Sequence, residues 1–237
     1  QVLLSAGAEE SQIMAKLQPI ATDMHALGNP WISYSVYLNN SFLPGLLQLM
    51  ILLVTVFSIG SEMKRATSRE WLRTADDSII IAITGKLIPQ TIIFFSMGLL
   101  YLSLLYGYLH FPMHNSIWHM IFAMFLLVVA SQSFAVIIMC FAPSLRIGLS
   151  VGGLVGVLSL SIAGFSFPVP AMYLPFQAIS YVLPVRHYFL IYVDQALNGI
   201  PLYYSRVHYV ALILFAVAST PLLPRLKKAL MRQVYVP

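Results

Sequence analysis

The chain has 237 residues, of which 59% are hydrophobic and 9% are charged, and its formal net charge is +5. A soluble domain carries about 25% charged residues, so this chain has too few charges to cover a surface that faces water, and a lipid bilayer is its expected solvent. The basic residues gather at the ends of apolar runs, where membrane topology accounts for them without nucleic-acid binding. The lone Cys140 excludes an internal disulfide framework.

The N-terminal part, residues 1–40, is mixed and polar, unlike the rest of the chain. It has no basic flank followed by an apolar run, so it does not resemble a signal peptide. We expect residues 1–40 to be the end of an extracytoplasmic domain, and the chain to be a fragment of a longer protein. Residues 41–237 are expected to form one transmembrane domain.

Five apolar segments are long enough to cross a bilayer. A helix rises about 1.5 Å per residue and therefore needs about 20 residues, with a range of roughly 17 to 25, to cross the hydrocarbon core. Lipid offers no hydrogen-bond partners to the backbone, so segments that cross it must be helical. The predicted spans cover about residues 43–60, 87–109, 117–141, 147–167 and 207–223. They predict an all-α membrane protein, a polytopic bundle of five transmembrane helices.

A charged segment, residues 62–77, separates the first two spans. Its charged residues are Glu62, Lys64, Arg65, Arg69, Glu70, Arg73, Asp76 and Asp77. Asp76, Asp77 and Ser78 suit the start of a helix at Ile79, because short acceptor side chains cap free backbone amides and negative charge favours that helix end. Spacing within the segment is moderately compatible with a helix at the membrane face. An ordinary loop, with basic side chains reaching to the interface, is the alternative.

A proline-rich segment, about residues 168–190, follows the fourth span. It is apolar enough to suggest a sixth span, but Arg186 and His187 interrupt it, and prolines break the helical hydrogen bonding. The prolines are Pro168, Pro170, Pro175 and Pro184. We therefore predict two short half-helices that dip into the membrane or lie on it. Arg186 and His187 are expected at the outer interface with Asp194, where they could pair with one another.

Basic residues are unevenly divided between the two sides of a five-span topology. One side receives Lys64, Arg65, Arg69, Arg73, Lys86, Arg146, Arg225, Lys227, Lys228 and Arg232. The other side receives Lys16, Arg186 and Arg206. The basic side should be cytoplasmic, which places the N-terminus outside and the C-terminus inside. A sixth span would move the basic C-terminal tail outside and remove this asymmetry.

No catalytic, cofactor or metal site is expected on this chain. Gly85 and Lys86 do not form a phosphate loop, because Leu87 stands where Ser or Thr is required and the upstream glycine is missing. The histidines between the second and third spans are interrupted by Pro112 and have no carboxylate nearby, so a loop is favoured over a metal site. These histidines are His110, His114 and His119. Any ATP-driven work must therefore use another polypeptide.

Polar and small residues within the spans allow two interpretations each. The polar ones are Gln48, Gln90, Thr91 and Gln132. They could line a path or hydrogen-bond between helices, and we favour the second because no intramembrane acid accompanies them. The fourth span is rich in glycines, among them Gly148, Gly152, Gly153 and Gly156. Small residues four apart let helices approach closely, either for packing within the bundle or on a face near a translocation path.

Short motifs follow one another at a specific order and spacing between about Tyr37 and Arg232. They are Tyr37-Leu38-Asn39-Asn40, Pro44-Gly45, Glu62-Met63-Lys64-Arg65-Ala66-Thr67, Leu72-Arg73-Thr74-Ala75, Gly85-Lys86, Ser161 to Pro168, Leu183-Pro184 and Asn198-Gly199. Together they resemble the membrane subunit of ABC-2 type transporters, a family of bacterial drug and polysaccharide exporters. Three positions depart from the family pattern: Ala66 replaces the usual Gly, Ala75 replaces Pro, and Asp194 stands where Arg is common.

The resemblance implies an ABC-2 transmembrane domain of the type V exporter kind, seen here from the second of six spans onward, with a re-entrant external hairpin. Residues 62–77 would be the coupling helix, seated in a groove of a separate ATPase. The implied coupling residues are Glu62, Lys64, Arg65, Thr67, Arg69, Glu70 and Arg73. The implied gate residues of the external hairpin, about residues 168–190, are Pro168, Pro175, Pro184 and Arg186.

The implied function is that of a non-enzymatic permease subunit of an ATP-binding-cassette exporter of the drug-efflux, multidrug kind. It would lie in the inner membrane and pair with a second permease subunit, with the path along the dimer interface near the first and fourth spans. ATP and magnesium would bind the partner ATPase. The alternative is an ATPase-independent secondary transporter or channel, which should show intramembrane acids, an inverted repeat or broken helices in both halves. A membrane-embedded enzyme would need a nucleophile, base or metal within the spans.

Overall fold

The computed structural model describes residues 33–232, and all regular structure in this range is helical. The long helices are α3 (Tyr34–Lys64), α5 (Ile79–Leu102), α6 (Ile117–Phe141), α7 (Leu145–Ile162) and α10 (Leu202–Val217). The short helices are α4 (Ser68–Thr74), α8 (Leu174–Tyr181), α9 (Pro184–Tyr192) and α11 (Leu223–Arg232). Short π-helical and 3₁₀ segments extend or join them: η1 (Ser103–Tyr108), η2 (Val169–Ala171), η3 (Val193–Leu197) and η4 (Thr220–Leu222).

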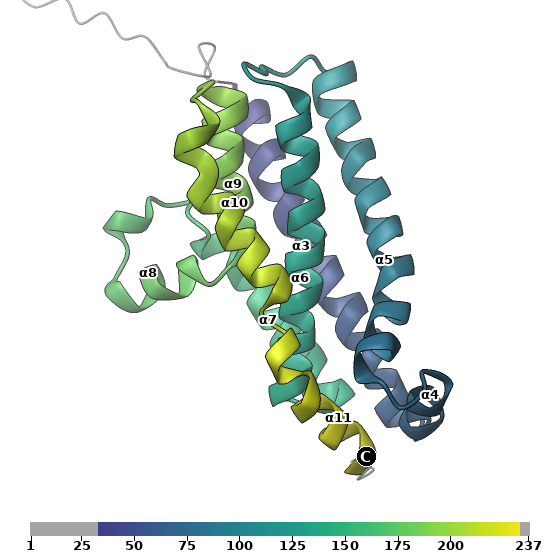
Figure 1. The fold of residues 1–237 in the computed structure, drawn as a ribbon. Coiled ribbons are helices and arrows are strands. Elements are labelled where there is room, and N and C mark those ends of the chain that lie inside the picture. The colour runs from purple at the N-terminus through teal and green to yellow at the C-terminus, as the bar shows by residue number, and fades with distance from the viewer. Residues whose placement is uncertain (1–32, 233–237) are drawn as a thin grey trace, which may run out of the picture.

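The long helices run alternately up and down, side by side, in one bundle (Figure 1). α4 and α11 lie at the same end, which we call the α4 end. The start of α3 and the connection from α5 to α6 lie at the opposite end (Figure 1). α8 protrudes sideways from the bundle, whereas α9 lies within it beside α10. The described chain therefore begins and ends at opposite ends of the bundle.

Five helical segments within the described residues are long and apolar enough to cross a membrane. They are Tyr34–Lys64, Ile79–Tyr108, Ile117–Phe141, Leu145–Ile162 and Leu202–Arg232. The predicted all-α bundle of five spans is confirmed, although the bounds differ from those expected. α3 begins at Tyr34, so residues 34–40, which we assigned to an external domain, continue the helix of the first span. The expectations for residues 1–32, including Lys16, lie outside the described residues.

Two further bounds differ for identifiable physical reasons. α5 begins at Ile79, well before residue 87, because Ser78 caps it and Lys86, within the helix, pairs with Glu62 of α3. α7 ends at Ile162, before residue 167, where Gly164 takes a left-handed φ of 102° and the chain turns. The charged segment 62–77 is not one helix, because a turn at residues 65–67 separates α3 from α4.

α6 is the central helix of the bundle. Of its most apolar stretch, 67% of the residues are buried inside the protein, against 22% for the corresponding stretches of α5, α7 and the last span. A helix that is apolar all round, as α6 is, belongs inside other helices, whereas the outer helices turn their large exposed apolar side chains to lipid. α3, α5, α9 and α10 pack against α6, whereas α7 packs mainly against α3.

Polar side chains within the spans join neighbouring helices, as the sequence predicted. Thr55 Oγ1 of α3 donates a hydrogen bond to Gln90 Oε1 of α5 at 3.1 Å. Thr91 Oγ1 of α5 donates to Gln132 Oε1 of α6 at 2.8 Å. Within an apolar environment such pairs each contribute about 0.6 to 2 kcal/mol and fix the register of the helices. The three helices α3, α5 and α6 are thereby linked in sequence.

Glycines of α7 allow it to pack closely against α3. A Cβ atom added at Gly156 would lie 3.2 Å from the Cα of Leu49 and 2.3 Å from its Cδ1. Gly148 faces Val56 in the same way, with an added Cβ 2.9 Å from Val56 Cγ1. The small residues of the fourth span therefore serve packing within the bundle, as expected from their four-residue spacing.

Candidate functional site

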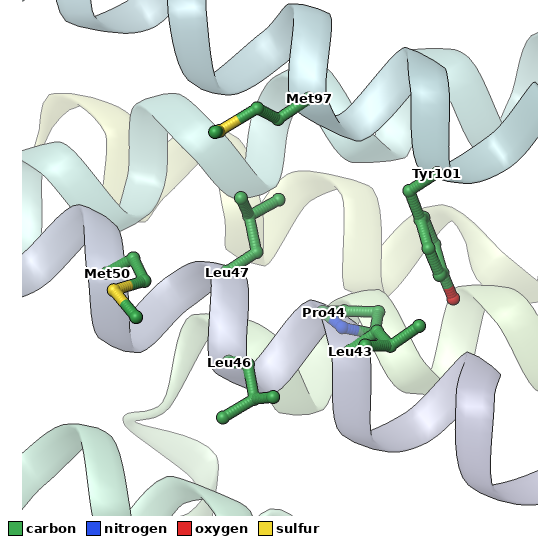
Figure 2. A pocket seen from close by; sticks show the side chains of 7 residues that line it. All are labelled: Leu43, Pro44, Leu46, Leu47, Met50, Met97 and Tyr101. Atoms are coloured by element: carbon green, nitrogen blue, oxygen red, sulfur yellow. The ribbon is translucent and has the colours of Figure 1, made fainter.

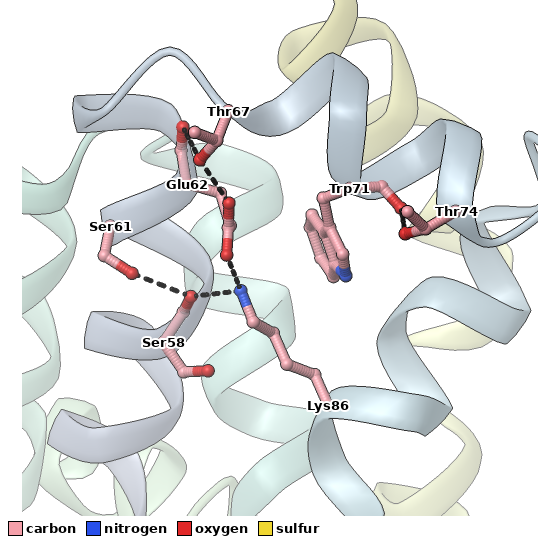
Figure 3. Close-up of polar contacts among 7 residues, drawn as sticks. All are labelled: Ser58, Ser61, Glu62, Thr67, Trp71, Thr74 and Lys86. Carbon is pink, nitrogen blue, oxygen red and sulfur yellow. Dashed lines mark hydrogen bonds and ion pairs between the residues drawn. The ribbon is translucent and has the colours of Figure 1, made fainter.

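An ion pair between the end of α3 and the start of α5 organises the α4 end. Lys86 Nζ lies 2.6 Å from Glu62 Oε1 and donates a second hydrogen bond to the Ser58 carbonyl at 2.8 Å (Figure 3). Lys86 Nζ also lies 4.3 Å from the centre of the Trp71 ring, which α4 supplies. Thr67 donates a hydrogen bond to the other carboxylate oxygen of Glu62. Lys86 of α5 thus contacts both α3 and α4, instead of merely anchoring α5 at the interface.

α4 is fixed on one face and exposed on the other. Ser68 and Leu72 are buried, and Leu72 packs with Ala75 and with Leu226 of α11. The opposite face carries Arg69, Glu70 and Arg73, all exposed. One face of α4 therefore presents charged groups at the surface, and the other packs on the neighbouring helices.

The residues implied as coupling residues divide into two groups. Glu62 and Thr67 are partly buried; Glu62 pairs with Lys86 and accepts a hydrogen bond from Thr67, so the two residues form the base of the site. The others are exposed at the α4 end: Lys64, Arg65, Arg69, Glu70 and Arg73. The sequence could not separate the groups, because the ion pair joins residues 24 positions apart in the chain.

Two tight turns flank α4. Ala66 has φ 59°, and Asp76 and Asp77 have φ 54° and 55°, in the left-handed region that costs a residue with a side chain roughly 1–2 kcal/mol. Ser78 then accepts a hydrogen bond from the backbone N–H of Ile81 at 3.5 Å and caps α5, as its position before Ile79 predicts. The turns hold α4 close to the ends of α3 and α5.

The C-terminal helix α11 packs on α4, which the sequence analysis did not predict. Lys227 Nζ donates to the Asp77 carbonyl at 2.6 Å, and Arg69 Nη2 donates to the Met231 carbonyl at 3.3 Å. Leu223, Leu226 and Leu230 are buried against the bundle. These leucines are spaced by three and four residues within a basic tail, a pattern that predicts an amphipathic helix. We interpreted the tail only as a determinant of topology.

The hairpin after α7 contains two short helices, each opened by a proline. Pro175 stands in the first turn of α8 and Pro184 in the first turn of α9, positions where proline is favoured because the missing N–H has no intrahelical partner. Pro168 precedes the 3₁₀ turn η2 and is exposed. The predicted half-helices are present, and α9 packs inside the bundle against α6 and α10.

Gln48 of α3 lies where α7 and α9 approach each other. Its Nε2 donates to Ser159 Oγ at 3.0 Å, and its Oε1 accepts from the backbone N–H of Val185 at 2.8 Å. It is fully buried. Gln48 has roughly 20 Å of α3 on each side of it, so this junction lies near the middle of the bundle.

Arg186 is placed differently from our expectation of an interfacial residue. It is 8% exposed, and its Nη1 donates to the carbonyl of Ala163, the C-cap of α7, at 3.0 Å. Asp194 instead accepts a hydrogen bond from Ser205 at 3.0 Å, and no ion pair joins it to Arg186 among residues 33–232. The chain turns back at Gly164, which brings Arg186 beneath the end of α7.

A shallow groove lies between α3 and α5 (Figure 2). It has a volume of about 200 Å³ and is lined by Leu43, Pro44, Leu46, Leu47, Met50, Met97 and Tyr101. The Tyr101 hydroxyl donates to the Asn39 carbonyl at 3.1 Å. The groove is apolar and suits hydrocarbon. Within the described part of the chain, no group of three or more His, Cys, Asp or Glu side chains could hold a metal ion.

Fold and polar sites together define a multi-pass helical membrane protein with a short, charged helix anchored across two spans. A comparison with protein families narrows this class. The family model described as ABC-2 family transporter protein matches residues 1–223. The chain therefore belongs to the ABC-2 transporter family and is a permease of ABC transporters. Comparisons with curated proteins and with solved structures found no match.

Proposed function

We propose that the chain is the permease subunit of an ATP-driven exporter and that α4 is its contact with a separate ATPase. The anchoring of α4 is the observation that carries this proposal. Its exposed face bears Arg69, Glu70 and Arg73, while the Glu62–Lys86 ion pair and Trp71 tie it to α3 and α5. ATP and magnesium bind the partner, and this chain supplies the path and the moving parts.

The geometry supports transmission of force from α4 to two spans together. A displacement of α4 changes the positions of Lys86 on α5 and Glu62 on α3, because both side chains meet beneath it. A partner that binds two positions of α4 with different affinity shifts the permease between inward- and outward-facing states. The proposed coupling residues are the seven that the resemblance implies. Glu62 and Thr67 support α4 from below. The exposed residues that contact the ATPase are Lys64, Arg65, Arg69, Glu70 and Arg73.

The remaining parts of the proposal concern the path and its gate. Two permease subunits pair, and cargo passes along their interface near α3 and α7, whose outer faces carry exposed apolar residues such as Phe57 and Leu154. The hairpin from residue 168 to 190 forms the external gate. The α4 end is cytoplasmic, and the protein lies in the plasma membrane, the inner membrane of a bacterium.

The proposal is tested by reversing charge on α4. In the variant Arg69→Glu plus Arg73→Glu, pull-down of the partner ATPase and ATP-driven transport in vesicles should both be lost. The matched control, Arg146→Glu plus Arg206→Glu, makes the same change in net charge on exposed residues outside α4 and should retain both. Association and transport that survive in the α4 variant would exclude α4 as the coupling site.

A second candidate is a transporter that needs no ATPase. The ends of α7 and α9, which meet near Gln48 within the bundle, favour it, because broken helices at mid-membrane are typical of secondary transporters. That class carries the feature in both halves of a repeat, whereas the described residues show it once. Transport by the permease alone, in vesicles with an ion gradient and no ATPase, would establish this alternative.

A further inference from the structure

Arg186 is a buried cation without an ionic partner. It is 8% exposed, and no ion pair involves it among residues 33–232. Its Nη1 is bound to the Ala163 carbonyl, but its Nε has no hydrogen-bond partner. A charged group inside a membrane protein is costly unless it is paired, and one that persists marks a site of function.

Capping of α7 accounts for only part of this arrangement. The carbonyl end of a helix carries partial negative charge, so a guanidinium beside Ala163 is favourable there. That bond uses one of the five N–H donors of the arginine. The adjacent His187 and its neighbour His208 are bases, whose ring nitrogens lie 3.4 Å apart. Asp194 accepts a hydrogen bond from Ser205 and forms no ion pair with Arg186 among residues 33–232.

Arg186 is covered by an aromatic ring at the end of α8. The Tyr181 ring lies over the guanidinium, with its centre 4.7 Å from Arg186 Cζ, and is 56% exposed. The neighbouring α8 turns large apolar side chains outward: Tyr173, Leu174, Phe176 and Ile179 are all exposed. A buried cation at the end of a helix with exposed apolar side chains is complementary to a molecule with an acidic head and an apolar body.

We propose that Arg186 binds the anionic group, a phosphate or a carboxylate, of an amphiphilic cargo at the junction of α7 and α9. The apolar body of the cargo lies along α8, and Tyr181 moves aside to admit the head. The fork of Arg186 matches the geometry of both acidic groups. This inference rests on the proposed export function, for which it names the chemistry of the cargo.

The test measures equilibrium binding to the permease alone, in nanodiscs of zwitterionic lipid. Dodecyl phosphate should bind at least about tenfold more tightly than dodecanol, since a hydrogen-bonded charge contributes that much or more. Arg186→Gln should remove the difference, and Tyr181→Ala should strengthen phosphate binding by uncovering the guanidinium. The control Arg206→Gln, an exposed arginine of α10, should bind as the wild type does.

Equal binding of the two probes by the wild type, or an undiminished preference in Arg186→Gln, overturns the proposal. If Arg186→Gln does not fold, Arg186→Lys keeps the charge but not the fork and should retain a reduced preference for phosphate. In the complete complex, dodecyl phosphate should stimulate the ATPase and dodecanol should not. Binding without stimulation would overturn the assignment as cargo. Because binding needs no ATPase, failure of the coupling proposal is detected separately.

Discussion

Among single residues, Lys86 connects several groups at the α4 end. It joins Glu62, the Ser58 carbonyl and the Trp71 ring, and its side chain is 20% exposed, against 23% for Glu62. A partly buried pair of this kind is screened less than a surface pair, and breaking it leaves one charge without its partner. Lys86 therefore stabilises the packing of α4 against α3 and α5.

The Glu62–Lys86 pair should show a measurable coupling energy. In a double-mutant cycle with Glu62→Gln and Lys86→Met, followed by denaturant unfolding in detergent, we expect a coupling above about 1 kcal/mol. Arg73→Met is the control, because Arg73 is exposed and has no ionic partner among residues 33–232. It should change stability by less than about 0.5 kcal/mol. Additive effects in the Glu62–Lys86 cycle would mean that the pair does not hold α3 to α5.

Ala66 is a position where the side chain is unfavourable. Its φ of 59° is one that glycine adopts without steric cost. Ala66→Gly should therefore stabilise the protein by up to about 1 kcal/mol, since relief of the strain exceeds the entropy that glycine adds to the unfolded chain. Thermal unfolding in detergent measures this. Ala218→Gly, at a helical φ of −61°, should destabilise instead, and a loss of stability in both variants would show that Ala66 is not strained.

Among the elements, α11 shows why a topology predicted from basic residues does not reveal helix packing, here the contact between α11 and α4. Basic residues in the tail satisfied the positive-inside rule, and that rule needs no further structure. The leucines at 223, 226 and 230 lie on the opposite face from most of the bases and pack beside Leu72 and Ile79. These contacts link residues about 150 positions apart, as the 2.6 Å bond between Lys227 and Asp77 shows, and no local pattern reports such a distance.

Removal of a buried leucine from α11 should loosen α4. Leu226→Ala is expected to destabilise the α4 end by about 2–5 kcal/mol, the usual cost of a large-to-small change in a packed core. Hydrogen exchange of the amides in residues 68–74 should accelerate. Leu214→Ala, on the exposed face of α10 with 61% of the side chain exposed, is the matched control and should leave that exchange unchanged. Equal exchange in the two variants would show that α11 does not support α4.

The hairpin shows what its sequence could and could not predict. Prolines at 168, 175 and 184 correctly indicated two short helices because proline suits the first turn and breaks an interior. The sequence left open whether the hairpin enters the bundle, because that depends on where α7 stops. That point is set by the turn at Gly164 and by the hydrogen bonds that Gln48 makes to α7 and α9. Both hydrogen bonds of Gln48 join residues that are distant in sequence.

Across the whole molecule, the length and apolar character of the spans were sufficient to predict five crossings, since lipid leaves the backbone no alternative to helices. The same argument cannot identify which helix is central. α6 and α5 are both strongly apolar, yet α6 is enclosed and α5 lies at the edge. Burial depends on the neighbours that a helix acquires, and these follow from pairs such as Thr91 with Gln132.

The orientation of the bundle in the membrane can be tested on the folded protein. Basic residues are concentrated at the α4 end, so that end should face the cytoplasm. Single-cysteine variants in a Cys140→Ser background allow labelling of intact cells with an impermeant maleimide. Tyr203→Cys, 62% exposed near the start of α10, should react in intact cells, whereas Arg146→Cys, exposed at the α4 end but outside α4, should react only after permeabilisation. The reverse pattern would place α4 outside the cell, where no ATP-driven partner could reach it.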